Sequence, residues 1–424
     1  MKIRKLHLKN IGVFDDEEIN FQECPAKDKA EIHILTGENG TGKTTILMAL
    51  AYPFSKVSLK IGDGGLELEK RIRKVQKEVD QEFIKVCFDD NRIYESRIYF
   101  DGSFGATATF EKPKIDSEDT HSNYAVFAFS GQRQTKTERI ETIKEPKDFN
   151  PLSQSLNFVK DYTQANELTI NQLIANNFSK SGIEYKKGNT EKSERFEKVV
   201  KAIEQAIFEI TDLQIKFDLQ TEPTNLVLKL NREELDFDVL PDGLRSLISW
   251  IADLLGRVDL LKWEDDLPIT EKNLILLLDE IEVHLHPAWQ RKVLPIVQKL
   301  FKNAQIFVST HSPFVVNSVD DAWVYKLKVD ENGKAHCEKP IRSEDGISYQ
   351  TVLSEIFGID QEFGGKTQDD LDKFYKIIRN GKVINEKDLT DLAKSLAEQS
   401  EELNSIVQIE LRQLNRKRGT NFAV

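Results

Sequence analysis

The stretch 31-EIHILTGENGTGKTTILMALA-51 decides the fold of this chain. Residues 31–35 predict a buried strand, and residues 44–50 predict the start of a helix. Between them, Gly37–Thr44 matches the pattern G-x-x-x-x-G-K-[ST] at every position. In such a loop, successive backbone N–H groups wrap a phosphate chain, and the helix N-terminus adds partial positive charge. A glycine-rich loop that matches by chance is disfavoured by the strand before it and the helix after it.

The loop predicts a nucleotide site that uses ATP and Mg²⁺. We expect Lys43 to reach the β- and γ-phosphates and to take part in catalysis, while the hydroxyl of Thr44 holds Mg²⁺. The nucleotide-binding residues expected here are Asn39, Gly40, Thr41, Gly42, Lys43, Thr44 and Thr45.

A second segment, 273-NLILLLDEIEVHLHPAWQ-290, ends an apolar run with two adjacent carboxylates. Asp279 and Glu280 repel each other and are costly to desolvate at the end of a buried strand. A bound magnesium nucleotide offsets that repulsion, so we expect Asp279 to hold Mg²⁺ and Glu280 to polarise the attacking water. The alternative is an exposed acidic turn after a core strand.

Three histidines lie close to these segments. His311 follows the apolar run in 307-FVSTHSP-313 and is a candidate for contact with the γ-phosphate, although a capping histidine explains it equally well. His284 and His286 form an H-x-H pair that is compatible with zinc. No third or fourth ligand lies at a suitable spacing.

The bulk composition indicates a soluble protein of ordinary globular type. The 424 residues are 39% hydrophobic and 31% charged, with a formal net charge of −12. No apolar run is as long as a membrane span, and 1-MKIRKLHLKN-10 lacks the core of a signal peptide. The three cysteines have no metal or disulfide spacing, so we expect a cytoplasmic protein. The acidic total disfavours a global field that attracts nucleic acid.

The order of elements predicts an α/β fold with a mostly parallel sheet, because strands alternate with helices. An antiparallel meander is expected over residues 83–110. Four regions are predicted. These are an N-terminal lobe (1–150), a helical insertion (151–210), a second lobe with the acidic pair (211–330) and a mostly helical C-terminal region that docks a partner (331–424).

The set "GENGTGKT", "LPDGLRS", "LLLDEIEVHLHP" and "STHSP" resembles the ABC-type ATPase heads of the SMC, RecF and overcoming-lysogenization-defect (OLD) proteins. The resemblance implies a two-lobed head, and a dimer or higher oligomer in which ATP lies between the Walker A loop of one head and the signature motif of another. It makes Glu280 the catalytic base and His311 the switch histidine. Gln132, in 129-FSGQRQ-134, becomes the glutamine that senses metal and attacking water.

The signature motif departs from the family pattern. The family form is L-S-G-G-Q, whereas residues 240–244 are "LPDGL". Gly243 is retained at the helix start, so its N–H is expected to face a phosphate across a dimer. Pro241 replaces the serine and removes a hydroxyl, for which Arg245 or Ser246 is a candidate substitute.

A narrower resemblance rests on 240-LPDGLRSLISWIADLL-255, 279-DEIEVHLHPAWQ-290 and 346-GISYQTVLSEIFGID-360. Together these segments look like the PtuA-type ATPases of Septu and retron-linked anti-phage systems. The resemblance implies that the chain works with a separate HNH nuclease (PtuB-like), with DNA reached through the complex, and is not itself a nuclease.

Two further functions stay open. An OLD-like nuclease needs a TOPRIM acidic pair, but Asp370 and Asp372 lie in a helical pattern, and only about a hundred residues follow His311. A RecF-like DNA repair ATPase is weakly disfavoured by the acidic total. The leucines Leu389, Leu392, Leu396 and Leu403 define an amphipathic pattern that either packs on the head or docks a partner.

Overall fold

The computed structural model describes residues 1–24, 28–54, 81–98, 104–109, 122–131, 170–221, 224–230, 233–343, 348–359, 363–379, 386–420 and 422. Contacts between residues divide the chain into two compact units, Met1–Val352 and Leu353–Val424. Each unit is described by itself.

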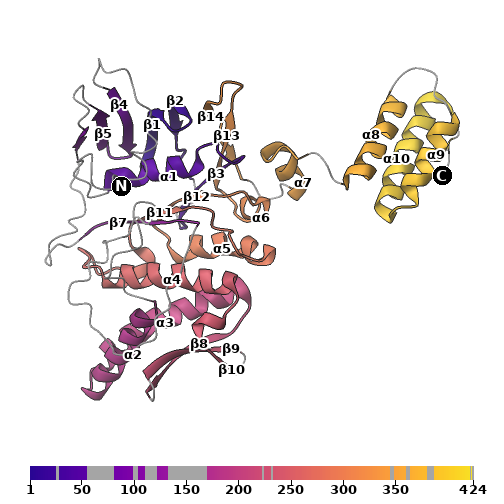
Figure 1. Cartoon of the computed structure of the whole chain (residues 1–424). Coiled ribbons are helices and arrows are strands. Elements are labelled where there is room, and N and C mark those ends of the chain that lie inside the picture. The colour runs from indigo at the N-terminus through magenta and orange to yellow at the C-terminus, as the bar shows by residue number, and fades with distance from the viewer. Residues whose placement is uncertain are drawn as a thin grey trace. The chain divides into compact units, whose positions relative to one another are not determined.

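The centre of the first unit is a mostly parallel sheet with the order β14-β13-β3-β12-β11-β7 (Figure 1). Its parallel strands are β3 (Glu31–Gly37), β7 (Ala125–Phe129), β11 (Leu274–Leu278), β12 (Gln305–Ser309) and β13 (Trp323–Val329). The short strands β14 (Ala335–Cys337) and β15 (Ile341–Arg342) pair antiparallel with β13. Because the strands are parallel, the loops that follow β3, β7, β11 and β12 all leave the same edge of the sheet.

A second, antiparallel sheet is formed by the N-terminal part of the chain. Its order is β2 (Phe14–Asn20), β1 (Ile3–Ile11), β4 (Gln81–Phe88), β5 (Ile93–Ile98) and β6 (Phe104–Ala108). The strands β4, β5 and β6 pair in chain order, which confirms the predicted meander.

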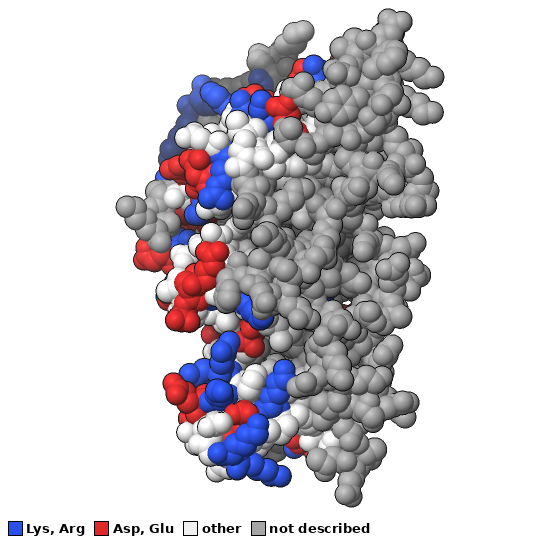
Figure 2. All heavy atoms as spheres, turned by 90° about the vertical axis from the view of Figure 1, so that its left-hand side faces the viewer, with Lys and Arg blue, Asp and Glu red and all other residues white. Residues whose placement is uncertain are grey.

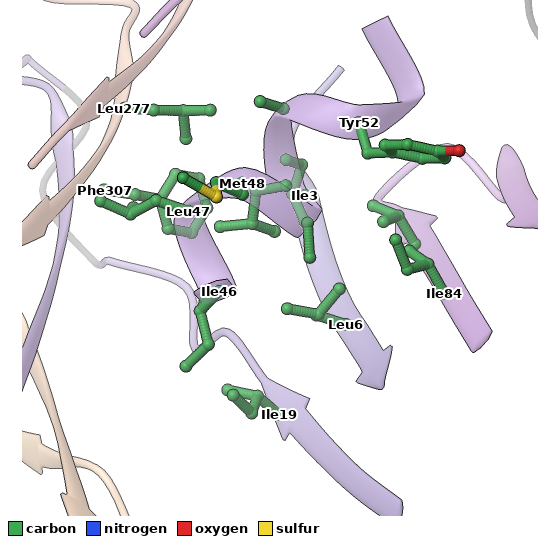
Figure 3. Packing of buried hydrophobic residues seen from close by; sticks show 14 of the residues in the cluster. Ile3, Leu6, Ile19, Ile46, Leu47, Met48, Tyr52, Ile84, Leu277 and Phe307 are labelled. Carbon is green, nitrogen blue, oxygen red and sulfur yellow. The ribbon is translucent and has the colours of Figure 1, made fainter. Parts of the chain in front are cut away.

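Helix α1 (Lys43–Ala51) packs between the two sheets. Figure 3 shows Leu47 and Met48 beside Phe307 of β12 and Leu277 of β11, and Leu6 of β1 near Ile46. The short turn η1 (Tyr52–Phe54) extends this core toward β4. Because α1 is buried by both sheets, the phosphate-binding loop before it is held on a rigid support.

Helices cover the other face of the parallel sheet (Figure 1). On this face Phe129 of β7 contacts Trp250 of α4 (Asp242–Leu260), with 6.1 Å between ring centroids. The remaining elements of the first unit are α2 (Ile170–Lys186), α3 (Thr190–Thr211), β8 (Ile215–Thr221), β9 (Thr224–Leu230), β10 (Glu233–Leu235), η4 (Phe237–Val239), η5 (Ile269–Glu271), α5 (Pro287–Leu300), α6 (Pro313–Val316) and α7 (Tyr349–Thr351).

The π-helical turn η6 (Val352–Ile356) crosses the boundary into the second unit, which consists of the helices α8 (Gly365–Arg379), α9 (Glu386–Ala397) and α10 (Glu401–Arg418). These three helices share their own apolar core, in which Leu389, Leu396 and Leu403 are buried. The leucine pattern is therefore covered within this unit, by Leu371 and Phe374 of α8 among others. Asp370 and Asp372 lie on α8.

The predicted α/β class, with its parallel sheet, N-terminal antiparallel sheet and helical C-terminal region, is confirmed. Among the described residues, no helix is long and apolar enough to cross a membrane. Figure 2 shows acidic and basic side chains interspersed on the described part of one face.

Candidate functional site

The loop after β3 has the backbone that a phosphate cradle requires. Gly37 and Gly42 have φ values of 145° and 95°, which favour glycine. A Cβ atom on Gly37 would lie 2.4 Å from the carbonyl oxygen of Leu327, and one on Gly42 would lie 2.5 Å from the ring of Phe14. Both glycines are therefore required by the fold. Asn39 and Gly40 are exposed at the tip of the loop, while Thr41 and Thr45 are buried beside it.

Lys43 turns its side chain back into this loop. Its Nζ donates to the carbonyl oxygens of Gly37 at 2.9 Å and Glu38 at 2.8 Å. Burial lowers the pKa of Lys43, and the nearby carboxylates of Asp279 and Glu280 oppose that shift. A buried cation with acidic neighbours on one side is suited to bind phosphate oxygens that enter the same loop.

The structure brings the loop and the acidic pair together. The hydroxyl of Thr44 donates to Asp279, at 3.2 Å from Oδ1 and 3.0 Å from Oδ2, across 235 positions of sequence. Ser309, at the end of β12, donates its hydroxyl to Asp279 Oδ1 and accepts the backbone N–H of Glu280 at 2.9 Å. Asp279 is thus fixed between α1 and β12.

These oxygens fit a magnesium ion. Mg²⁺ prefers hard oxygen ligands and is usually held by one or two protein groups together with the phosphates of the nucleotide. Thr44 and Asp279 present a hydroxyl and a carboxylate side by side, so they are the residues that would hold the ion.

Glu280 has a left-handed backbone, with φ of 45°. Its side chain packs against Gly131, where an added Cβ would lie 2.8 Å from Glu280 Oε2 and 2.9 Å from Glu280 Cβ. The loop after β7 therefore approaches Glu280 closely. Gln132, the expected sensor residue, lies outside the described residues.

His311 follows β12 and lies in the same electrostatic environment. Burial lowers its pKa, Lys43 lowers it further, and Asp279 opposes the shift. The imidazole is therefore neutral near pH 7 and available as a hydrogen-bond donor or acceptor. Its backbone N–H donates to Glu282 Oε1 at 2.5 Å.

The residues of the H-x-H pair lie apart from this arrangement. His286 Nδ1 accepts the backbone N–H of Ala288 at 3.2 Å and caps α5. His284 is exposed, with φ of 64°. Within the described residues, no group of three or more His, Cys, Asp or Glu side chains is arranged to hold a metal ion.

Gly243 lies in the first turn of α4 and is buried against the loop that follows β11. A Cβ atom on it would lie 2.3 Å from the carbonyl oxygen of His284 and 3.5 Å from Trp289. Pro241 is the N-cap residue and makes no side-chain cap hydrogen bond. Arg245 pairs with Asp242 at 2.5 Å, and Ser246 is buried. The role of Gly243 toward a second protomer stays a prediction.

Sequence analysis gave no individual role to three residues that organise the site: Ser309, Glu282 and Gln290. Gln290 accepts the Ser312 hydroxyl at 2.6 Å and donates to the carbonyl oxygen of Leu285 at 2.8 Å. The sequence offers a signal for Ser309 and Glu282, because a polar residue close behind an apolar strand is a candidate site residue. Gln290 lies on a helix face, and no sequence pattern distinguishes it from its neighbours.

Comparison with protein families matches residues 32–317 to the model described as "AAA domain, putative AbiEii toxin, Type IV TA system". Residues 1–55 also match a model described as "AAA domain".

Among curated proteins, the chain is 31% identical over 201 residues to "Retron Ec83 probable ATPase" of Escherichia coli, a match that covers 47% of this chain and 35% of that protein. It is 23% identical over 376 residues to "Septu protein PtuA" of Bacillus thuringiensis, a match that covers 85% of each. These relatives confirm the resemblance inferred from the motifs. The solved SMC head bound to the C-winged helix domain of ScpA matches with a TM-score of 0.47 and 14% identity, over 82% of this chain and 100% of that one.

Proposed function

Because this chain belongs to the AAA domain family whose model matches two thirds of it, we propose that it binds and hydrolyses ATP. The observation that carries the proposal is the hydrogen bond from Thr44 to Asp279, since it joins the phosphate-binding loop to the acidic pair. That pairing is what a magnesium nucleotide site requires. When bound, Mg²⁺ neutralises charge on the phosphate oxygens.

Each site residue has a separate role in the proposed reaction. The loop N–H groups and Lys43 bind and orient the β- and γ-phosphates. The carboxylate of Glu280 lies one residue beyond Asp279 and takes a proton from the attacking water as general base. The neutral imidazole of His311, in the loop after β12, contacts the terminal phosphate. Gln132 is proposed to orient the same water.

We further propose that two chains associate through their heads, and that Gly243 of one chain completes the ATP site of the other. Support comes from the exposed N-terminus of α4, where Pro241 and Asp242 face solvent. Hydrolysis would then release the pair. The similarity to retron and Septu proteins supports a role in anti-phage defence, in which the nucleotide state controls a partner HNH nuclease in the cytoplasm.

The first test is ATP hydrolysis by the purified full chain with Mg²⁺ and with EDTA. We expect activity only with Mg²⁺, and no ATP uptake by calorimetry would refute the proposal. The partner is tested separately, by purifying the chain together with the product of the adjacent gene. If no HNH protein co-purifies, the ATPase proposal stands and the nuclease partner is rejected.

A further inference from the structure

The loops that follow β11 and β12 are joined by side chains to which the motifs give no individual role. The strands themselves are in parallel register, with Leu278 opposite Val308. The backbone N–H of Thr310 still pairs with the carbonyl oxygen of Leu35 in β3, at 3.1 Å. The next N–H along the chain, that of His311, leaves the sheet and donates to the side chain of Glu282. The side chain of Glu282 thus accepts the first backbone N–H after β12 that is no longer paired within the sheet.

The environment of Glu282 is unfavourable for a carboxylate that serves packing alone. Burial raises its pKa, the hydrogen bond from the backbone N–H of His311 opposes that shift, and the nearby charge of Glu280 raises the pKa further. Its Oε2 atom is buried and has no hydrogen-bond partner among the described residues. Buried polar atoms without partners are rare in native proteins, and they concentrate where function requires the group.

A second side chain, that of Gln290, also connects the loops after β11 and β12. Gln290 of α5 accepts the Ser312 hydroxyl and donates to Leu285, so it also joins the two loops. The contact between Gln290 and Ser312 lies one residue beyond His311 and does not involve the His311 backbone. Only Glu282 accepts the backbone N–H of the histidine itself within the described residues.

We propose that Glu282 is a positioning residue for ATP hydrolysis, which accepts the backbone N–H of His311 and so holds the imidazole at the terminal phosphate. The inference rests on the proposed ATPase function. It assigns the third carboxylate of "DEIE" to the histidine in the loop that follows the neighbouring strand. Asp279 and Glu280 serve the metal and the water.

Two substitutions at Glu282 separate positioning from charge. Glu282→Ala removes the acceptor, whereas Glu282→Gln keeps an amide oxygen for the same N–H. We expect Glu282→Ala to lower kcat about 10- to 100-fold, as for the loss of one hydrogen bond to a charged group. The KM for ATP should change less than about threefold, because the phosphate-binding loop is untouched. Glu282→Gln should retain kcat within about threefold.

Glu204→Ala is the matched control. Glu204 is also a partly buried carboxyl with a raised pKa, and it accepts the backbone N–H of Phe217 at 2.8 Å between α3 and β8. Its loss should lower thermal stability and leave kcat unchanged. A purely structural role for Glu282 predicts that the two alanine variants behave alike.

A double-mutant cycle with His311→Ala tests whether Glu282 acts through the histidine. We expect Glu282→Ala to cause no further loss of kcat in the His311→Ala background. Independent, multiplying effects would overturn the inference, as would a Glu282→Gln variant that is as slow as Glu282→Ala.

Amide hydrogen exchange tests the contact without hydrolysis. The peptide that contains residues 305–316 should exchange faster in Glu282→Ala than in the unmodified protein, and at the unmodified rate in Glu282→Gln. Unchanged exchange in Glu282→Ala would overturn the inference whatever the ATPase activity is. A chain that hydrolyses no ATP would refute the proposed function instead.

Discussion

The contact between Gly243 and His284 gives a prediction with a worked magnitude. A Cβ atom at residue 243 would lie 2.3 Å from the His284 carbonyl oxygen, whereas ordinary contact begins at 3.4 Å. The obstacle is backbone, so a side-chain rotation cannot relieve it. Gly243→Ala must therefore displace α4 or the loop after β11 by about 1 Å, at the cost of about 1–3 kcal/mol that is typical of overpacking.

The intrinsic preference of helices for alanine opposes this cost. Replacing Gly by Ala inside a helix stabilises a protein by about 0.5–1 kcal/mol. Because the clash costs about 1–3 kcal/mol, we expect Gly243→Ala to be destabilising overall. Gly182 provides the matched control, because it lies in α2 and an added Cβ there meets no atom within 4 Å. Gly182→Ala should stabilise the protein by about 0.5–1 kcal/mol.

Thermal melting and ATP hydrolysis together check the prediction. Each kcal/mol shifts the melting temperature by about 1–2 °C in a unit as large as Met1–Val352, so the two variants should move in opposite directions. Gly243→Ala should also lower kcat, because the displaced loop carries Glu280 and Glu282. A Gly243→Ala variant with unchanged stability and full activity would refute the argument from close packing.

Three further predictions follow from the site and the core. Lys43→Ala should weaken ATP binding by about 10- to 100-fold in calorimetry, because one charge-assisted contact to phosphate is lost. Glu280→Gln should bind ATP, hydrolyse it at least about 100-fold more slowly and accumulate as a dimer in light scattering; fast turnover would remove Glu280 from the base role. Glu31→Gln should destabilise the protein by about 3 kcal/mol near neutral pH, because Arg4 and His33 lose a buried partner. These contacts hold the folded pKa of Glu31 below its usual 4.5, so the difference should be full above that pH and shrink in urea melts as the pH falls below it.

Local patterns were sufficient to place the candidate site segments that sit on single elements. The phosphate-binding loop lies between an apolar strand and an apolar helix, and Asp279 ends a run of five apolar residues. Periodicity and turn residues report such local features directly. The same holds for the meander of β4, β5 and β6, whose strands pair in chain order.

Contacts between distant segments were outside the reach of these patterns. Ser309 meets Asp279 only because β11 and β12 pair with Leu278 opposite Val308, and parallel register between separate segments leaves no local signature. The leucines of α9 and α10 showed that an apolar face exists but not what covers it. The structure supplies Leu371 and Phe374 of α8 as part of the cover.

The loop after β11 carries two strained residues, and their anchors explain how the site is kept in shape. Glu280 and His284 both have left-handed backbones, at a cost of order 1 kcal/mol or more each for residues with a side chain. Such strain persists only where neighbours fix it. Ser309 accepts the N–H of Glu280, and the Gly243 position of α4 abuts the carbonyl oxygen of His284. The loop is thus anchored at one end to the sheet and at the other to α4. We therefore expect a displacement of α4 at its N-terminus to shift the loop that carries Glu280.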